Sequence, residues 1–189
     1  QAEQELLREG TSIEELQRLC DVHSALFHGS ATDAQKLHSK DIQDQRLSAA
    51  AALIQISGHP LQTFTLENAA LEKLIARAKQ VLENGTIDDG SLNELRQIAI
   101  HYAKKGDLLY PHLKVQYGIS GPSAVMWTVD DEIRDELNAL AKQKDQKETD
   151  AWKQRLNAVL TRMEEMIYKE SNILFPNCAL NFSEEEWDH

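Results

Sequence analysis

Four polar residues interrupt otherwise apolar helical stripes, each in a different segment of the chain. They are Glu67, His101, Asp130 and Glu170. A buried carboxylate without a partner costs on the order of several kcal/mol, so such residues are expected to be paired or to bind a metal. Carboxylates and an imidazole that converge from four helices form the kind of site that holds iron, manganese or zinc in a bundle. His59, just before the first of these segments, is a candidate fifth ligand.

A metal-free interpretation stands beside this one. A glutamate on a stripe is more often solvated or paired with a neighbouring lysine or arginine than bound to metal. In that case the four residues are expected to pair with Lys105, with nearby hydroxyl groups or with water.

Cys20 and His23 form a second, smaller candidate site. They are three residues apart on one helical face, where a thiolate and an imidazole could share a metal or respond to oxidation. Packing of both side chains against the protein is the favoured interpretation. The sequence has no glycine-rich phosphate loop and no signature of a nucleophile with its base, so the chain is not expected to be an enzyme.

Apolar residues at steps of three and four predict the helices that position these residues. The expected helices run from about 61 to 83, from about 91 to an interruption at Pro111, from 122 to about 141, and from about 150 to just before Pro176. The first carries the stripe Phe64, Glu67, Leu71, Leu74, Ala78 and Val81. The second carries Leu95, Ile98, His101, Lys105 and Leu108. Four amphipathic helices with short links predict an all-α, up-down-up-down four-helix bundle.

A smaller N-terminal helical domain is expected over residues 1–57, with the bundle over residues 58–189. Helices are predicted at about 12–27, 32–39 and 45–56, and Gly58-His59-Pro60 then breaks the chain. The first residue is Gln1 rather than methionine, so the N-terminal domain is expected to be truncated.

Composition limits the partners of the protein. Its net charge of −11 repels phosphate groups, so neither nucleic acid nor an anionic membrane surface is expected to bind. No apolar run is long enough to span a bilayer, and two cysteines in 189 residues do not indicate a disulfide framework. A cytoplasmic location follows as the expectation. Trp127 and Trp152 are expected in the core.

One segment of the chain is repeated. The run from Lys105 to Pro111, KGDLLYP, matches the run from Glu170 to Pro176, ESNILFP, position by position. The ends of the second and fourth bundle helices therefore share one local design, in which Lys105 corresponds to Glu170.

Several short motifs together resemble a known family. They are Gly58-His-Pro60, Glu67-Asn68, His101-Tyr-Ala-Lys-Lys105, Leu109-Tyr-Pro111, Gly118-Ile-Ser-Gly-Pro122, Val125-Met-Trp127, Asp131-Glu-Ile-Arg134, Met166-Ile-Tyr-Lys-Glu170, Ile173-Leu-Phe-Pro176 and Glu186-Trp187. This set is similar to the hemerythrin-like (HHE cation-binding) domain. More narrowly, it resembles the uncharacterised subfamily in which that domain follows a small helical N-terminal domain and is often linked to a PAS domain. Leu19-Cys-Asp-Val-His23 with Ala25-Leu-Phe27 resembles the end of the N-terminal domain.

The resemblance implies a non-haem di-iron or related metal centre, and the chain departs from the family pattern at four positions. Gln62 and Asp130 stand where relatives tend to have histidines, and Gly106 and Ser171 stand where they have glutamates. Asp130 can still ligate a metal, whereas Gly106 and Ser171 scarcely can.

Two functions follow from this pattern. The first is a binding and sensory module with a modified His/carboxylate site, built from His59, Glu67, His101, Asp130 and Glu170. It would hold iron (di-iron or mononuclear), zinc or manganese and sense oxygen, nitric oxide or redox state. The second is a bundle that has lost its metal and serves as a structural or protein-interaction module. The expected partner is a C-terminal PAS domain or another protein, and a homodimer is a further alternative. An iron-dependent oxidase ranks third, since it needs a full ligand set and an open coordination position.

Overall fold

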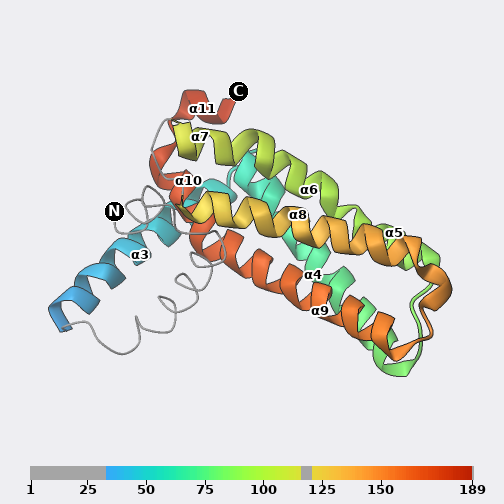
Figure 1. The fold of residues 1–189 in the computed structure, drawn as a ribbon. Coiled ribbons are helices and arrows are strands. Elements are labelled where there is room, and N and C mark those ends of the chain that lie inside the picture. The colour runs from blue at the N-terminus through green and yellow to red at the C-terminus, as the bar shows by residue number, and fades with distance from the viewer. Residues whose placement is uncertain (1–32, 116–120, 189) are drawn as a thin grey trace, which may run out of the picture.

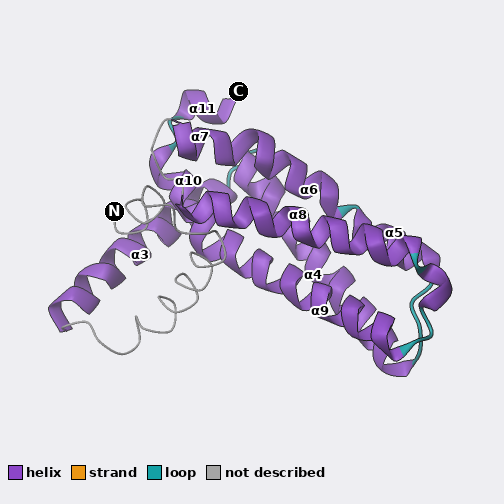
Figure 2. Cartoon of the chain, in the orientation of Figure 1, coloured by secondary structure: helices purple, strands orange, loops and turns teal. Residues whose placement is uncertain are grey.

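The computed structural model describes residues 33–115 and 121–188, and every regular element in these two ranges is helical (Figure 2). An antiparallel bundle of helices runs along the long axis of the molecule (Figure 1). Its elements are α4 (Pro60–Asn84), α5 (Asp89–Arg96) with α6 (Ile98–Lys104), α8 (Gly121–Lys142) and α9 (Asp150–Lys169). Helix α9 packs against α4 and α8, and α5 packs against α4 and α8, so four rods enclose one core. The expected all-α fold is confirmed.

The start of each bundle helix is set by a recognisable signal. His59 caps α4 by accepting a hydrogen bond from the Leu61 amide at 3.0 Å, and Pro60 occupies the first turn. Gly58 adopts a positive φ of 84°, which turns the chain into this cap. Asp88 and Thr149 cap α5 and α9 in the same way.

The core fills the space between the rods with large apolar side chains. Trp152 is buried, and its Nε1 donates to the Leu140 carbonyl at 3.1 Å, as a buried indole requires. The stripes of α8 and α9 are as expected from their spacing. All of Met126, Asp130, Ile133, Leu137, Leu140, Leu156, Val159, Met163, Met166 and Glu170 are buried.

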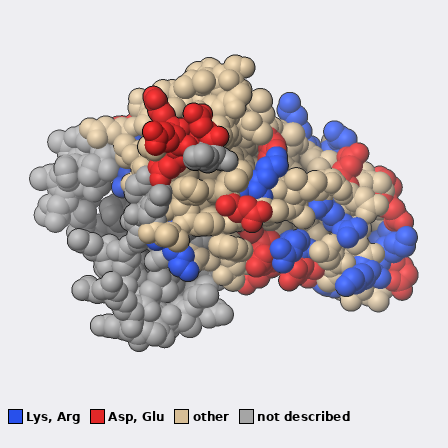
Figure 3. Space-filling model, turned by 90° about the horizontal axis from the view of Figure 1, so that it is seen from above, with Lys and Arg blue, Asp and Glu red and all other residues tan. Residues whose placement is uncertain are grey.

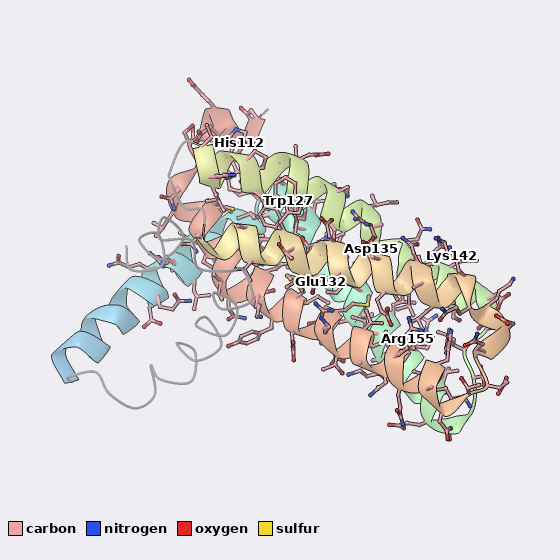
Figure 4. All side chains as sticks on the ribbon, viewed as in Figure 1. His112, Trp127, Glu132, Asp135, Lys142 and Arg155 are labelled. Carbon is pink, nitrogen blue, oxygen red and sulfur yellow. The ribbon has the colours of Figure 1, made fainter. Side chains whose placement is uncertain are left out.

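The stripe expected for α4 is right at Phe64 and Ala78, which are buried, and at Leu71 and Leu74, which pack against the core, but it is wrong at Val81 and only partly right at Glu67. Its buried residues are Leu61, Phe64, Asn68, Ile75 and Ala78. Val81, placed on the expected stripe, is exposed, and Glu67 is only partly covered. The helix has apolar residues on adjacent faces, so spacing alone could not choose between two overlapping stripes. Trp127 is also not in the core: it is 44% exposed on α8, where this helix runs beside α6 (Figure 4).

The two repeated segments form a pair of π-helices. These are η1 (Lys105–Leu109), which leads into α7 (Tyr110–Val115), and η3 (Glu170–Leu174), which leads into α10 (Phe175–Asn181). A proline in a helix lacks its N–H and clashes with the carbonyl four residues earlier, and Pro111 and Pro176 lie four residues after positions within η1 and η3. The wider π turn relieves this clash, so the chain continues as a helix. The helix end expected before Pro176 is therefore wrong, and the interruption expected at Pro111 is only the change from η1 to α7.

The N-terminal part of the described chain is a single helix, α3 (Asp33–Ile54), which projects from one end of the bundle (Figure 1). Two separate helices, at 32–39 and 45–56, were expected here. No glycine or proline lies between them, so nothing stops the helix from continuing. Helix α3 packs against α10 and α4. The helix expected at 12–27 lies outside the described residues.

Short links close the far end of the bundle. Lys144, in the 3-10 turn η2 (Lys144–Gln146), and Lys147 both pair with Asp89 at the start of α5, each at 3.0 Å. Figure 3 shows acidic and basic side chains interspersed toward this end of the bundle. The last element is the short helix α11 (Glu184–Asp188). None of the described helices is long and apolar enough to cross a membrane.

Candidate metal centre

The structure brings the four stripe residues of the bundle together with one lysine. Glu170 and Lys105 are 0% exposed, Asp130 is 3% exposed and His101 is 4% exposed. Glu67 lies at the edge of this group, with its side chain 29% exposed. These five residues, called the buried polar cluster below, come from α4, α6, η1, α8 and η3.

Lys105 lies at the centre of the cluster. Its Nζ donates to Asp130 Oδ1 at 2.9 Å and also donates to Glu170 Oε1. The same ammonium lies 4.3 Å from the centroid of the Tyr102 ring, within range of a cation–π interaction. One lysine therefore joins the carboxylates of two different elements.

His101 lies between two carboxylates. Its Nδ1 is 2.8 Å from Glu67 Oε2, and its Nε2 is 3.0 Å from Glu170 Oε2. Each ring nitrogen therefore faces a carboxylate oxygen at hydrogen-bonding distance, and the tautomer decides which nitrogen donates. Phe64 holds the ring in place by an edge-on contact with ring centroids 5.4 Å apart.

The remaining oxygens of the cluster also have donors. Asn68 Nδ2 donates to Glu170 Oε2 at 2.7 Å, Tyr110 donates its hydroxyl to Asp130 Oδ2 at 2.8 Å, and Lys104 donates to Glu67 Oε1. Glu170 thus accepts from three side chains and Asp130 from two. Such a network satisfies the buried charges from within the protein.

The pKa values of the two deepest carboxyl groups move in opposite directions. Burial alone would raise the pKa of Glu170, but Lys105 and His101 outweigh it and lower the pKa to about 2. Burial raises the pKa of Asp130 to about 6, because Lys105 and Tyr110 offset the loss of solvation only in part and the charge of Glu170 adds to it. The pKa of Glu67 is lowered, since the hydrogen bonds from Lys104 and His101 exceed the effect of its partial burial.

The other candidate site residues lie elsewhere. The Nδ1 of His59 caps α4, and its ring packs against Trp187 with centroids 4.7 Å apart. No hydrogen bond in the described part of the chain joins His59 to the cluster. Cys20 and His23 lie outside the described residues.

A cavity of about 230 Å³ approaches the cluster from the surface, between η1 and α8. It is lined by Tyr102, Ala103, Gly106, Asp107, Trp127, Asp130, Asp131 and Arg134. Gly106 has no side chain to fill it, and Trp127, stacked on Tyr110, forms one wall. Asp130 is therefore the member of the cluster that lies at this cavity.

Comparison with known families identifies the family to which the bundle belongs. Residues 59–178 match the family described as hemerythrin HHE cation binding domain. The chain belongs to this hemerythrin family. Residues 1–33 match a second family, described only as a family of unknown function (DUF438). No curated protein matches the chain.

The hemerythrin family implies a bound cation, and the residues present in this chain do not fit one. The ammonium of Lys105 lies where two of the expected ligands, Asp130 and Glu170, would meet a metal. Each nitrogen of His101 faces a carboxylate oxygen, at 2.8 and 3.0 Å, so a metal would have to replace one of these contacts. Among the residues that the structure describes, no three His, Cys, Asp or Glu side chains are arranged to hold a metal ion.

The metal-free interpretation of the sequence predicts Lys105 as a partner of the stripe residues, and its pairing with Asp130 and Glu170 agrees with it; the central position of Lys105 is what the sequence does not show. The family's altered positions were assigned to Gly106 and Ser171, but Ser171 is exposed and a side chain at Gly106 would face Trp127. The useful signal was the repeated segment, which aligns Lys105 with Glu170 and so places opposite charges at equivalent positions.

Proposed function

We propose that this chain is a non-catalytic regulatory module, in which the hemerythrin-type bundle and the N-terminal helical segment act on one another. The contact of α3 with η3 is the observation that carries this proposal. Gln43 of α3 donates its Nε2 to the Asn172 carbonyl of η3 at 3.0 Å. Helix α3 lies in the chain between the two family matches, at 1–33 and 59–178.

The local chemistry explains why this carbonyl accepts a hydrogen bond from another helix. In an α-helix, the Asn172 carbonyl would accept from residue 176, which is a proline without an N–H. Pro176 thus leaves acceptor capacity on η3, and Gln43 uses it. Ala50, also on α3, is buried at this end of the bundle, so packing accompanies the hydrogen bond.

The same π-helix carries a member of the buried polar cluster. Glu170 is the first residue of η3, two residues before Asn172. Irregular turns of this kind are frequent at functional sites, because a π turn and an α turn differ by a small shift in register. A change in the docking of α3 at Asn172 would therefore affect Glu170, two residues away, and through it Lys105 and His101.

The cluster itself supports a non-catalytic role. Its charged groups are paired with one another, and Lys105, Glu170, Asp130 and His101 are each at most 4% exposed, with Asp130 at the edge of the cavity beside η1. Asp130, the carboxylate at the cavity, is held by Lys105 and Tyr110, and no open coordination position is seen at the cluster among the residues that the structure describes. A metal-holding sensor of oxygen, nitric oxide or redox state stays a prediction. The convergence of the four stripe residues favours it, and the position of Lys105 argues against it.

Hydrogen–deuterium exchange of the full chain tests the contact between α3 and the bundle. Gln43→Ala removes the donor to η3, whereas Gln45→Ala, an exposed glutamine on the same helix, serves as the matched control. Ala50→Glu is a stronger disruption of the packing. Gln43→Ala and Ala50→Glu are expected to speed exchange in η3 and α10 and in peptides that contain Lys105. Unchanged exchange of these peptides in both variants would refute the proposal.

A further inference from the structure

We propose that the ammonium group of Lys105 takes the place of the metal cation in this hemerythrin-type bundle. The protein would then supply its own internal cation, and the fold would not need a metal. This substitution is independent of the contact between α3 and η3, so either proposal can fail alone.

The position of the ammonium supports this replacement. Lys105 and Glu170 are both fully buried, and Nζ donates to carboxylates from α8 and η3. The face of the Tyr102 ring, 4.3 Å away, is a third favourable neighbour. An ammonium has three N–H donors, so two carboxylates and one ring satisfy it without water.

The carboxylates of the cluster are paired without an added ion. They are Glu67, Asp130 and Glu170, and their basic partners are Lys104, Lys105 and His101. Each carboxylate has at least one cationic group in direct contact. A divalent metal at this place would have to displace Lys105 from both carboxylates.

The repeated segments place Lys105 opposite Glu170. Lys105 and Glu170 are the first residues of η1 and η3, and the two π-helices present them to one another across the bundle. With glutamate at both positions, two buried carboxylates would face one another and would need a cation between them. With lysine at position 105, the cation is a side chain.

Four proteins, each the full chain, test the proposal by thermal unfolding and by elemental analysis. They are the natural sequence, Lys105→Met, Lys105→Glu and Lys104→Met. Lys104 is the matched control, because it is the neighbouring lysine and also pairs with a carboxylate, but its side chain is 37% exposed. Melting is followed without metal and with added zinc, manganese or ferrous iron.

The natural protein is expected to carry no stoichiometric metal and to keep its Tm when these ions are added. Lys105→Met should lower Tm by on the order of 10 °C, because it leaves buried carboxylates without their cation, and Lys104→Met should change it little. Lys105→Glu should be less stable still without metal, and a rise of its Tm with zinc, manganese or iron would support the proposal directly. If Lys105→Glu does not fold at all, the need for a cation at this position is supported. The metal content and the Tm of the natural protein then test whether it binds a metal.

Two results would overturn the proposal. One is stoichiometric metal in the natural protein, or a Tm that rises when metal is added to it. The other is a Lys105→Met variant that melts at the same temperature as Lys104→Met.

Discussion

Among single residues, Asp130 and Glu170 show how neighbours decide the cost of burying a charge. Both accept a hydrogen bond from Lys105, yet only the pKa of Glu170 is lowered. Glu170 also faces His101 and Asn68, whereas Asp130 gains only the hydroxyl of Tyr110 and is repelled by Glu170. Asp130 is therefore the weakly stabilised carboxylate of the cluster.

This difference predicts how the stability of the natural protein, compared with that of Asp130→Asn, varies with pH. Burial raises the pKa of Asp130 from 3.8 to about 6 in the folded protein, so the folded state holds this proton more tightly than the unfolded state. The stability that Asp130 contributes is fully present below 3.8 and is lost as the pH rises through about 6. The free energy of unfolding of the natural protein, minus that of Asp130→Asn, should therefore fall across this window. Chemical denaturation at a series of pH values measures it, and a difference that is flat or rises with pH would contradict the assignment.

The sequence could identify most of the buried cluster but not its central member. Glu67, His101, Asp130 and Glu170 are found by the same test, a polar residue on an apolar stripe. Lys105 passes that test too, and it stands on the expected stripe of its helix. The sequence predicts Lys105 as a partner of the four residues but not as the centre of the cluster. A pattern of spacing cannot show which side chain of a converging set lies in the middle.

Among the elements, η1 accounts for the error in the expected face of the second bundle helix. Leu108 was placed on the inner stripe, but it is exposed, and Leu109 and Tyr110 are buried instead. A π turn takes up one extra residue, so the inner face moves by one position after Lys105. Spacing rules that assume 3.6 residues per turn cannot foresee this shift, although the prolines that cause it are visible in the sequence.

A pair of glycine substitutions tests the description of the helices at Gly106 and Gly90. An added Cβ at Gly106 would lie 3.9 Å from Trp127, an ordinary contact, so Gly106→Ala should raise the free energy of unfolding by roughly 0.5–1 kcal/mol. A Cβ at Gly90 would lie 2.9 Å from the Asp88 oxygen that caps α5. Gly90→Ala should therefore gain nothing, or lose about 1 kcal/mol through the cap. Urea denaturation of both variants checks this, and a destabilised Gly106→Ala would mean that η1 is packed more tightly than described.

Across the whole molecule, stability rests on the apolar core that runs along α8 and α9. Leu156 on α9 is 0% exposed, whereas Leu66 on α4 is 65% exposed. Leu156→Ala should cost about 2–5 kcal/mol, the usual range for a buried leucine, and Leu66→Ala should cost close to nothing. Denaturant unfolding of the two variants measures both values, and a small cost at Leu156 would show that the register of α9 is wrong.

The overall architecture was accessible from sequence because its signals reinforce one another. The stripes of α8 and α9, the glycines and prolines between helices and the family motifs all indicate the same bundle. The course of α3 was not foreseen, since its polar and apolar residues have no clear stripe. Its docking depends on Asn172 and α10, which lie more than a hundred residues further along the chain.

A crystal structure of the full chain, purified from cells grown with iron and measured with anomalous scattering near the iron and zinc edges, decides what lies between Asp130 and Glu170. We expect the Lys105 ammonium within hydrogen-bonding distance of both carboxylates, with no anomalous peak in the buried polar cluster. An anomalous peak bound by Glu67, His101, Asp130 or Glu170, with Lys105 turned away from them, would contradict the replacement of the metal by lysine.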